Sequence, residues 1–329
     1  MKKFFAFAIA AATMAVGCQK FQDLINPNNN QTVGEDELVE IKFSSNVVTV
    51  ETKITDLKDA GTVYLYGLND AAEGTANRRE LKNVAATVGG DAEPYELTLA
   101  EPAFYHSSAN YDFFGYYLDG ATVTGDLATG YESALPIVIT GAEDVLLGAG
   151  KENGAYNAVA ARGGKNVEIE FLHKLSKFTF SAVNMGNSEL TLNDIVVVTP
   201  LSGEINVTGG QTLVATGEPA NIDLEVTPFT LTGRQGVEPA PEDYTPADVE
   251  ALVFPNSTYT LHFNLTQGTD SRWIPVTFSE AIEEGKAYNF EVKLYSLEEI
   301  QITATLKAWD EVTIGIDTAG TEEGNSPLA

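Results

Sequence analysis

Residues 167–183 read VEIEFLHKLSKFTFSAV and form the longest alternation of apolar and polar side chains in the chain. Val167, Ile169 and Phe171 occupy alternate positions, and a second alternation begins at Phe178. A period of two is the pattern of a β-strand with one buried face. The stretch therefore predicts strands on both sides of a change in pattern, and an all-β fold around them.

Alternating runs recur on both sides of this stretch, with turn residues between them. They occupy residues 38–43, 47–50, 63–68, 93–99, 111–118, 190–198, 204–207, 222–231, 250–254, 259–265, 273–278, 288–295, 300–309 and 312–316. Gly115 interrupts the aromatic run at 111–118, and a glycine inside a strand often marks a bulge or a close approach of another segment. Many short strands separated by turns are typical of β-sandwiches rather than of a parallel sheet.

The length of 329 residues suits two domains, because domains commonly hold about 100–200 residues. We expect an N-terminal β-sandwich at 38–172 and a C-terminal β-sandwich at 173–317. The boundary falls inside the strand-rich stretch quoted above. A polar tail at 318–329 completes the chain.

The N-terminus predicts export. Residues 1–17 have a basic start and an apolar run at 4–16, which is too short for a membrane span of about 20 residues, so they read as a signal peptide. The segment ends in AVGC and resembles a bacterial lipobox, although Ala15 stands where Leu is usual. We expect lipidation of Cys18, the only cysteine; ordinary secretion with a leftover cysteine is the alternative. Residues 18–37 are polar and Asn-rich and predict a flexible tether.

The charge and the residue types exclude several function classes. The chain has 19 basic and 47 acidic residues and a net charge of −28, which argues against binding to nucleic acid or to an anionic membrane surface. A single cysteine excludes an internal disulfide and a Cys-rich zinc site. The sequence contains no HExxH, GxSxG or Walker-type motif. We therefore expect no catalytic residue, no metal ligand set and no cofactor, with calcium in an acidic loop as an open alternative.

The aromatic strand at 111–118 allows two interpretations. The predicted strand has aromatic residues on both faces, namely Tyr111, Phe113, Phe114, Tyr116 and Tyr117. Core packing is the expected use of such rings. A platform on which sugar rings stack is the alternative, and it would suit a surface protein that binds glycans.

Several segments, taken in order, resemble the fimbrillin-like (Mfa-like) lipoproteins that build type V pili in anaerobic gut and oral bacteria. They are the lipobox ending at Cys18, IKFS at 41–44, VYLYG at 63–67, YDFFGYYLD at 111–119, EDVLL at 143–147, FLHKLSK at 171–177, GKAYNFEV at 285–292 and the strand ending at Trp309. The resemblance covers almost the whole chain, and FLHKLSK is its best single marker. It implies two transthyretin-like β-sandwich domains in tandem.

The resemblance also implies a processing step in which a trypsin-like protease cuts after the first strand and that strand leaves. Val39, Ile41 and Phe43 are the apolar side chains that would be lost. Lys53 is the first candidate for the cut and Lys58 the second. Many members of the family have Arg at the cut, and an ordinary edge-strand lysine is the alternative interpretation of Lys53.

A donor strand from another subunit would fill the vacated groove. The run at 311–317 is the candidate, because Val312, Ile314 and Ile316 alternate with polar or small residues. The alternative is that this run is the last strand of the second domain.

These features predict a structural subunit of a cell-surface pilus that is held at the outer membrane by a lipid before assembly. The expected partners are other pilus subunits, and a ligand on a host or bacterial surface is left open. The alternatives are a pilus tip or anchor subunit, or a monomeric surface lipoprotein that binds glycan or host protein.

Overall fold

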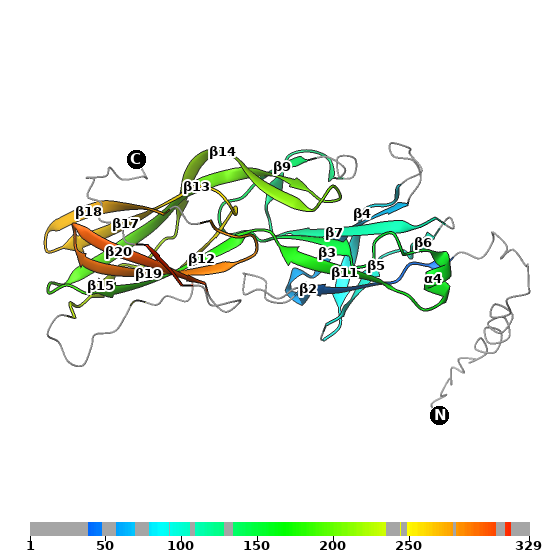
Figure 1. Cartoon of the computed structure of the whole chain (residues 1–329), viewed down its shortest axis with the longest axis horizontal. Coiled ribbons are helices and arrows are strands. Elements are labelled where there is room, and N and C mark those ends of the chain that lie inside the picture. Colours follow the sequence, from blue (N-terminus) through cyan, green and yellow to red (C-terminus); the bar gives the residue numbers. More distant parts are fainter. Residues whose placement is uncertain are drawn as a thin grey trace, which may run out of the picture. The chain divides into compact units, whose positions relative to one another are not determined.

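A computed structural model describes the elements of this chain from Val39 onward (Figure 1). The described residues are 39–47, 57–69, 79–91, 93–105, 109–127, 134–234, 244, 249–278, 281–306 and 313–316. The predictions at Cys18, Lys53 and Val312 lie outside them. Nearly all of the elements are β-strands, which confirms the all-β class.

Seven strands of the first half close into a barrel, in the order β10-β11-β2-β5-β4-β3-β7. Their bounds are β2 (Phe43–Val47), β3 (Thr62–Asn69), β4 (Arg79–Gly89), β5 (Tyr95–Leu99), β7 (Tyr111–Leu118), β10 (Val145–Gly150) and β11 (Val167–His173). A separate pair joins β1 (Val39–Glu40), which precedes β2 in the chain, to β6 (Phe104–Tyr105), which lies between β5 and β7. Two short helices, α2 (Leu57–Ala60) and α4 (Ala158–Arg162), lie in the connections β2–β3 and β10–β11.

The strand expected at 38–43 is interrupted. β1 pairs with β6, whereas β2 pairs with strands of the barrel. Between them the Ile41 N–H donates to the Ala103 carbonyl (2.8 Å), and the Lys42 carbonyl accepts from the Val167 N–H (2.8 Å). The chain therefore changes its partner at Ile41–Lys42, which an alternation of side chains does not reveal.

Two further sheets are built mainly from the second half of the chain. One has the order β16-β12-β19-β20-β21, and the other has the order β18-β17-β13-β9-β8, with β14 and β15 also paired to β13. The bounds are β8 (Thr122–Val123), β9 (Leu135–Val138), β12 (Ser176–Asn184), β13 (Leu190–Asn206), β14 (Thr212–Asp223), β15 (Phe229–Leu231), β16 (Glu250–Val253), β17 (Tyr259–Gln267), β18 (Asp270–Phe278), β19 (Ala287–Ser296), β20 (Glu299–Leu306) and β21 (Thr313–Ile316). Both sheets contribute to one apolar core, in which Phe178 and Phe290 meet edge to face.

The strand expected at 222–231 is also divided. β14 ends at Asp223, whose Oδ1 accepts a hydrogen bond from the Glu225 N–H (3.0 Å). Glu225 has a φ of 48°, which lies in the left-handed region and turns the chain away from an extended course. Pairing with β13 resumes at β15.

Strands from before the predicted boundary at Leu172 join the second half. β9 pairs with β13, so the β8–β9 hairpin extends a sheet of the later strands. A third apolar cluster joins Val145 and Leu147 of β10 to Ile205 of β13 and Phe254. β10 is therefore buried on both faces, which explains its continuous apolar sequence.

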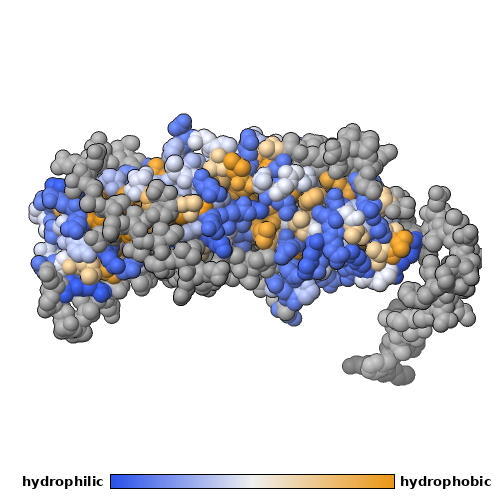
Figure 2. Space-filling view, in the orientation of Figure 1, coloured by the Kyte–Doolittle hydropathy of each residue, from blue (hydrophilic) through white to orange (hydrophobic). Residues whose placement is uncertain are grey.

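The surface of the described residues is mostly hydrophilic, with smaller apolar areas between the charged ones (Figure 2). The large apolar side chains that are exposed belong to Tyr64, Val138, Val159, Leu172, Met185 and Val214. Within the described part of the chain, no helix has both the length and the apolar character needed to cross a membrane.

Two strand glycines make room for one aromatic ring inside the barrel. Gly115 of β7 and Gly148 of β10 stand opposite each other in register. A Cβ atom at Gly115 would lie 2.7 Å from the Phe171 ring, and one at Gly148 would lie 2.8 Å from it. Gly115 thus marks a close approach, as the sequence predicts, and Phe171 of the FLHKLSK segment occupies the space.

Gly115→Ala should destabilise the fold, because the added methyl group overlaps the Phe171 ring in a closed barrel. We expect a loss of about 1–3 kcal/mol in the free energy of unfolding, measured by urea denaturation. Gly89→Ala is the matched control, since a Cβ there meets only the Glu96 carbonyl oxygen at 3.8 Å. Equal stability of the two variants would contradict this account of the glycine.

Candidate functional site

The candidate site is the place in the barrel occupied by β2, which we call the strand slot. β2 runs parallel to β11 on one side and antiparallel to β5 on the other (Figure 1). It is therefore the strand that closes the barrel between β5 and β11. Its removal would leave two edges of unpaired N–H and C=O groups.

Alternate side chains of the first strand segment point into the barrel core. Ile41, Phe43 and Ser45 are buried, and the Phe43 ring meets the Phe113 ring edge to face at 5.3 Å. Val39 is partly buried and packs against the same cluster. The structure thus brings the three predicted residues of the displaced strand to one core. It adds Ser45, which sequence reasoning missed although it stands two positions after Phe43 in the same alternation.

The outer face of β2 is held to β11 by polar contacts. The Asn46 side-chain amide donates to Glu168 Oε1 (2.7 Å), and the same oxygen pairs with Lys151 Nζ (3.2 Å). The Glu168 carboxylate raises the pKa of the Lys151 ammonium. The Lys151–Glu168 ion pair lies at the surface, and such pairs contribute little to stability. The burial of the inward side chains is therefore the main side-chain contribution to holding β2.

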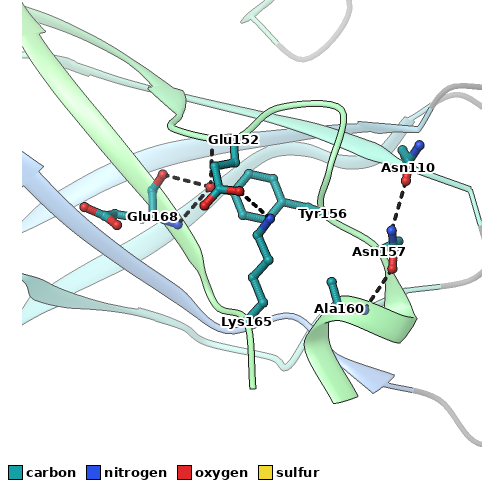
Figure 3. A network of polar contacts seen from close by, with 7 residues as sticks. All are labelled: Asn110, Glu152, Tyr156, Asn157, Ala160, Lys165 and Glu168. Atoms are coloured by element: carbon teal, nitrogen blue, oxygen red, sulfur yellow. Dashed lines mark hydrogen bonds and ion pairs between the residues drawn. The ribbon is translucent and has the colours of Figure 1, made fainter. Parts of the chain in front are cut away.

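The connection between β10 and β11 is organised by Tyr156 and Lys165 (Figure 3). The Tyr156 hydroxyl accepts from the Glu152 N–H (3.2 Å) and lies 3.4 Å from both the N–H and the carbonyl oxygen of Glu168. Lys165 Nζ lies 5.1 Å from the centre of the Tyr156 ring and 2.7 Å from Glu152 Oε2. These contacts fix the connection against the start of β11.

The same connection covers β1. Asn157 caps helix α4 by accepting from the Ala160 N–H (2.9 Å), and its amide donates to Asn110 Oδ1 (3.0 Å) (Figure 3). Ala158 and Ala161 of α4 pack against the core cluster that includes the first strand segment. β1 is thus held by β6 and α4, whereas β2 is held by β5 and β11.

The other predicted functional residues that the structure describes lie in elements other than β2. Lys58 lies in α2, in the connection that follows β2, and Lys53 precedes it outside the described residues. Ile314 and Ile316 lie in β21, which pairs antiparallel with β20. Among the described strands, β21 is the last in its sheet and has a neighbour on one side only.

The FLHKLSK segment forms the crossover from β11 to β12, and its polar groups are paired. His173 Nδ1 lies 3.0 Å from Asp144 Oδ2, and neither side chain is exposed. Lys174 Nζ lies 2.6 Å from Glu284 Oε1, and the Ser176 hydroxyl donates to the Glu283 carbonyl (2.7 Å). The three sequence segments EDVLL, FLHKLSK and GKAYNFEV thus meet at one place, which we call the crossover cluster.

Gly285 completes the crossover cluster. It has a φ of 67°, and a Cβ atom there would lie 2.8 Å from the His173 carbonyl oxygen. Both observations require glycine, because the left-handed region disfavours a side chain and the space is already filled. Gly285 therefore allows the main chain of His173 to approach closely.

Glu143 organises the turn that leads into β10. Its carboxylate accepts hydrogen bonds from the Thr140 N–H (2.7 Å), the Thr140 hydroxyl (2.8 Å) and the Ala142 N–H (3.2 Å). Burial alone would raise the pKa of this carboxyl, but the hydrogen bonds lower it below the ordinary value of 4.5. Gly141 in the same turn has a φ of 101° and approaches Ile222 of β14.

Glu143→Gln should destabilise the protein in a pH-dependent manner. A lowered carboxyl pKa stabilises the fold above its unfolded value of 4.5, and this contribution disappears as the pH falls through the lower pKa of the folded state. The urea midpoints of the two proteins should therefore differ near neutral pH and converge in acid. Glu204→Gln, on an exposed carboxylate of β13, is the control. A difference between wild type and Glu143→Gln that persists in acid would contradict this role.

The residues that the structure describes include no group of three or more His, Cys, Asp or Glu side chains placed to hold a metal ion. His262 is partly buried in β17, and this burial lowers the pKa of its imidazole. The strand slot itself consists of backbone pairing and mostly apolar packing.

Comparison of the sequence with known families identifies the chain. The profile of the fimbrillin-like family matches residues 47–309. The chain therefore belongs to the fimbrillin-like family. The matched residues begin at the last residue of β2 and end between β20 and β21. Most of β2 and all of β21 therefore lie outside the match.

Solved structures share the fold at low sequence identity. A candidate cell adhesion protein from Bacteroides uniformis has a TM-score of 0.54 at 19% identity, covering 84% of this chain and 99% of that one. A fimbrial protein from Bacteroides vulgatus has a TM-score of 0.54 at 14% identity, covering 82% and 99%. A candidate cell adhesion protein from Bacteroides ovatus has a TM-score of 0.51 at 15% identity, covering 86% and 100%. No protein with a curated description matches this sequence.

Proposed function

We propose that this protein is a structural, non-catalytic subunit of a cell-surface pilus, assembled by removal of its first strand and insertion of a strand from another subunit. The observation that carries the proposal is the pairing of β2 with both β5 and β11, with Ile41 and Phe43 buried beneath it. Membership of the fimbrillin-like family supports it. The fold shared with a fimbrial protein from Bacteroides vulgatus agrees with it.

The energetics favour replacement of the strand over an empty slot. Full burial of an apolar side chain such as Ile41 or Phe43 is worth roughly 1.5–3 kcal/mol. The freed edges of β5 and β11 would also lose their hydrogen-bond partners. A strand from another subunit restores both, which is the general mode of β-strand addition. Because the donor and acceptor surfaces differ, the contact repeats head to tail and yields an open filament.

Export and processing complete the proposal. Cys18 would carry a lipid that holds the subunit at the outer membrane until a protease cuts at Lys53 or Lys58. Both lysines lie between β2 and β3 in the sequence, so either cut separates the first strand from the rest of the chain. β21 would then serve as the donor strand, since Ile314 and Ile316 belong to a terminal strand with one neighbour in the described sheet.

The processing step can be tested on protein isolated from the surface of an expressing bacterium. We expect wild type to have an N-terminus at Ile54 or Asp59 and to form a ladder of SDS-resistant bands. Lys53→Gln/Lys58→Gln should keep a lipidated Cys18 at its N-terminus and run as a monomer, as determined by mass spectrometry and gel electrophoresis. Arg78→Gln/Arg79→Gln, at the start of β4 and one residue before it, is the control and should polymerise.

A wild-type protein that keeps Cys18 and runs only as a monomer would contradict the proposal. It would leave an anchor subunit or a monomeric binding lipoprotein. Polymerisation of the double-lysine variant without a cut would contradict the cleavage step.

The donor step has a separate test. Ile314→Asp/Ile316→Asp places charges where apolar side chains would enter the slot, and burying an unpaired charge is strongly unfavourable. We expect this variant to be cut normally but to form no ladder, because it accepts a strand and cannot donate one. Glu322→Lys/Glu323→Lys, in the polar tail, is the control. Normal polymers from the isoleucine variant would show that the donor strand lies elsewhere.

A further inference from the structure

The strand slot contains a polar defect at its centre. Ser45 lies in the middle of β2, opposite Tyr95 of β5 and Ile169 of β11. Its side chain is 0% exposed, and its Oγ has no hydrogen-bond partner among the described residues. The surrounding core cluster is apolar and aromatic.

An unpaired hydroxyl in such a core weakens the strand that carries it. The hydroxyl loses its bonds to water when β2 occupies the slot and gains no replacement there. Serine also presents fewer atoms to its neighbours than an aliphatic side chain would, so it gains less dispersion energy. Ile41 and Phe43 hold the strand, whereas Ser45 opposes its retention.

The neighbouring residue shows that the defect is specific to one face. Ser44 has the same side chain but stands on the opposite face of β2 and is partly exposed. Its hydroxyl can be solvated, so the chemistry of serine has no comparable cost there. The two adjacent serines therefore differ in environment and not in kind.

We infer that Ser45 is the specificity-determining position of the strand slot: it makes β2 a weak occupant, and the slot prefers an incoming strand with an apolar side chain at that place. This inference rests on the proposed function. The occupant to which it commits is the C-terminal strand of a second copy of this chain. Its Val312, Ile314 and Ile316 have the same alternate spacing as Ile41, Phe43 and Ser45.

The direction in which the second strand enters does not change the outcome. If the two runs align in the same direction, Ile316 takes the place of Ser45. If they align in opposite directions, Val312 takes that place. Either alignment replaces the unpaired hydroxyl with an aliphatic side chain, so the exchange would be favourable and the filament would be more stable than the unassembled subunit.

The first test compares the stability of uncut protein. Ser45→Ala removes the hydroxyl without adding volume, so the urea midpoint should rise above that of wild type. Ser44→Ala is the matched control and should leave the midpoint unchanged. A lower midpoint for Ser45→Ala, or equal midpoints for the two variants, would overturn the inference, because the Ser45 hydroxyl would then not weaken the strand.

The second test measures the preference of the slot directly. Protein cut at Lys53 or Lys58, verified by mass, is mixed with fluorescent peptides of residues 39–47 in three forms: wild type, Ser45→Val and Ser44→Val. The Ser45→Val peptide should displace the resident strand at a concentration roughly tenfold lower than the wild-type peptide. The Ser44→Val peptide should match the wild type. Equal displacement by all three, or none by any, would overturn the inference.

The two proposals fail in distinguishable ways. If polymers form on cells but the peptides show no preference at position 45, the assembly proposal stands and the inference about Ser45 falls. If the peptides rank as expected but no polymer forms on cells, the inference about the slot stands and the assembly proposal falls.

Discussion

The pairing of β2 with two neighbours at once is the constraint on which the barrel depends. Without β2, the other six strands form an open series in the order β11-β10-β7-β3-β4-β5. β2 joins the two ends of this series, β11 and β5. A strand in that place pairs with the backbone N–H and C=O groups at the edges of both β5 and β11. With five residues each, β2 and β5 are the shortest of the seven strands.

Local patterns in the sequence could predict the all-β class and most of the individual strands. The alternation at Val167, Ile169 and Phe171 follows directly from a strand with one face in a core, and Gly115 signals the close approach that Phe171 makes. Two expected strands are divided in the structure. The cause in each case is a backbone event, a change of partner at Ile41–Lys42 and a left-handed residue at Glu225, which side-chain periodicity does not register.

The parts of the site that could not be predicted depend on long-range contacts. Asp144 and His173 are 29 positions apart, and only the antiparallel pairing of β10 with β11 brings them together. Ser45 has the spacing of an inward position but not an apolar side chain, and beside Ser44 it reads as one of two exposed polar residues. Its burial follows from the closure of the barrel by β2. The sequence therefore predicts the strand, and the structure shows that Ser45 is its buried residue with an unpaired hydroxyl.

The crossover cluster explains how the barrel could lose β2 and keep the strand beside it. β11 pairs with β2 from Val167 to Phe171, and the Phe171 side chain also packs on the glycines of β7 and β10. Beyond Phe171, His173 is tied to Asp144, and the chain passes straight into β12 of the next sheet. The packing of the Phe171 ring on these glycines and the contact of His173 with Asp144 involve no side chain of β2, so removal of β2 would not break them directly. A rigid β11 would present an ordered edge to an incoming strand, which lowers the entropic cost of binding it. The buried His173 and the Glu284-paired Lys174 thus help to hold β11 beside the slot, although neither residue belongs to β2.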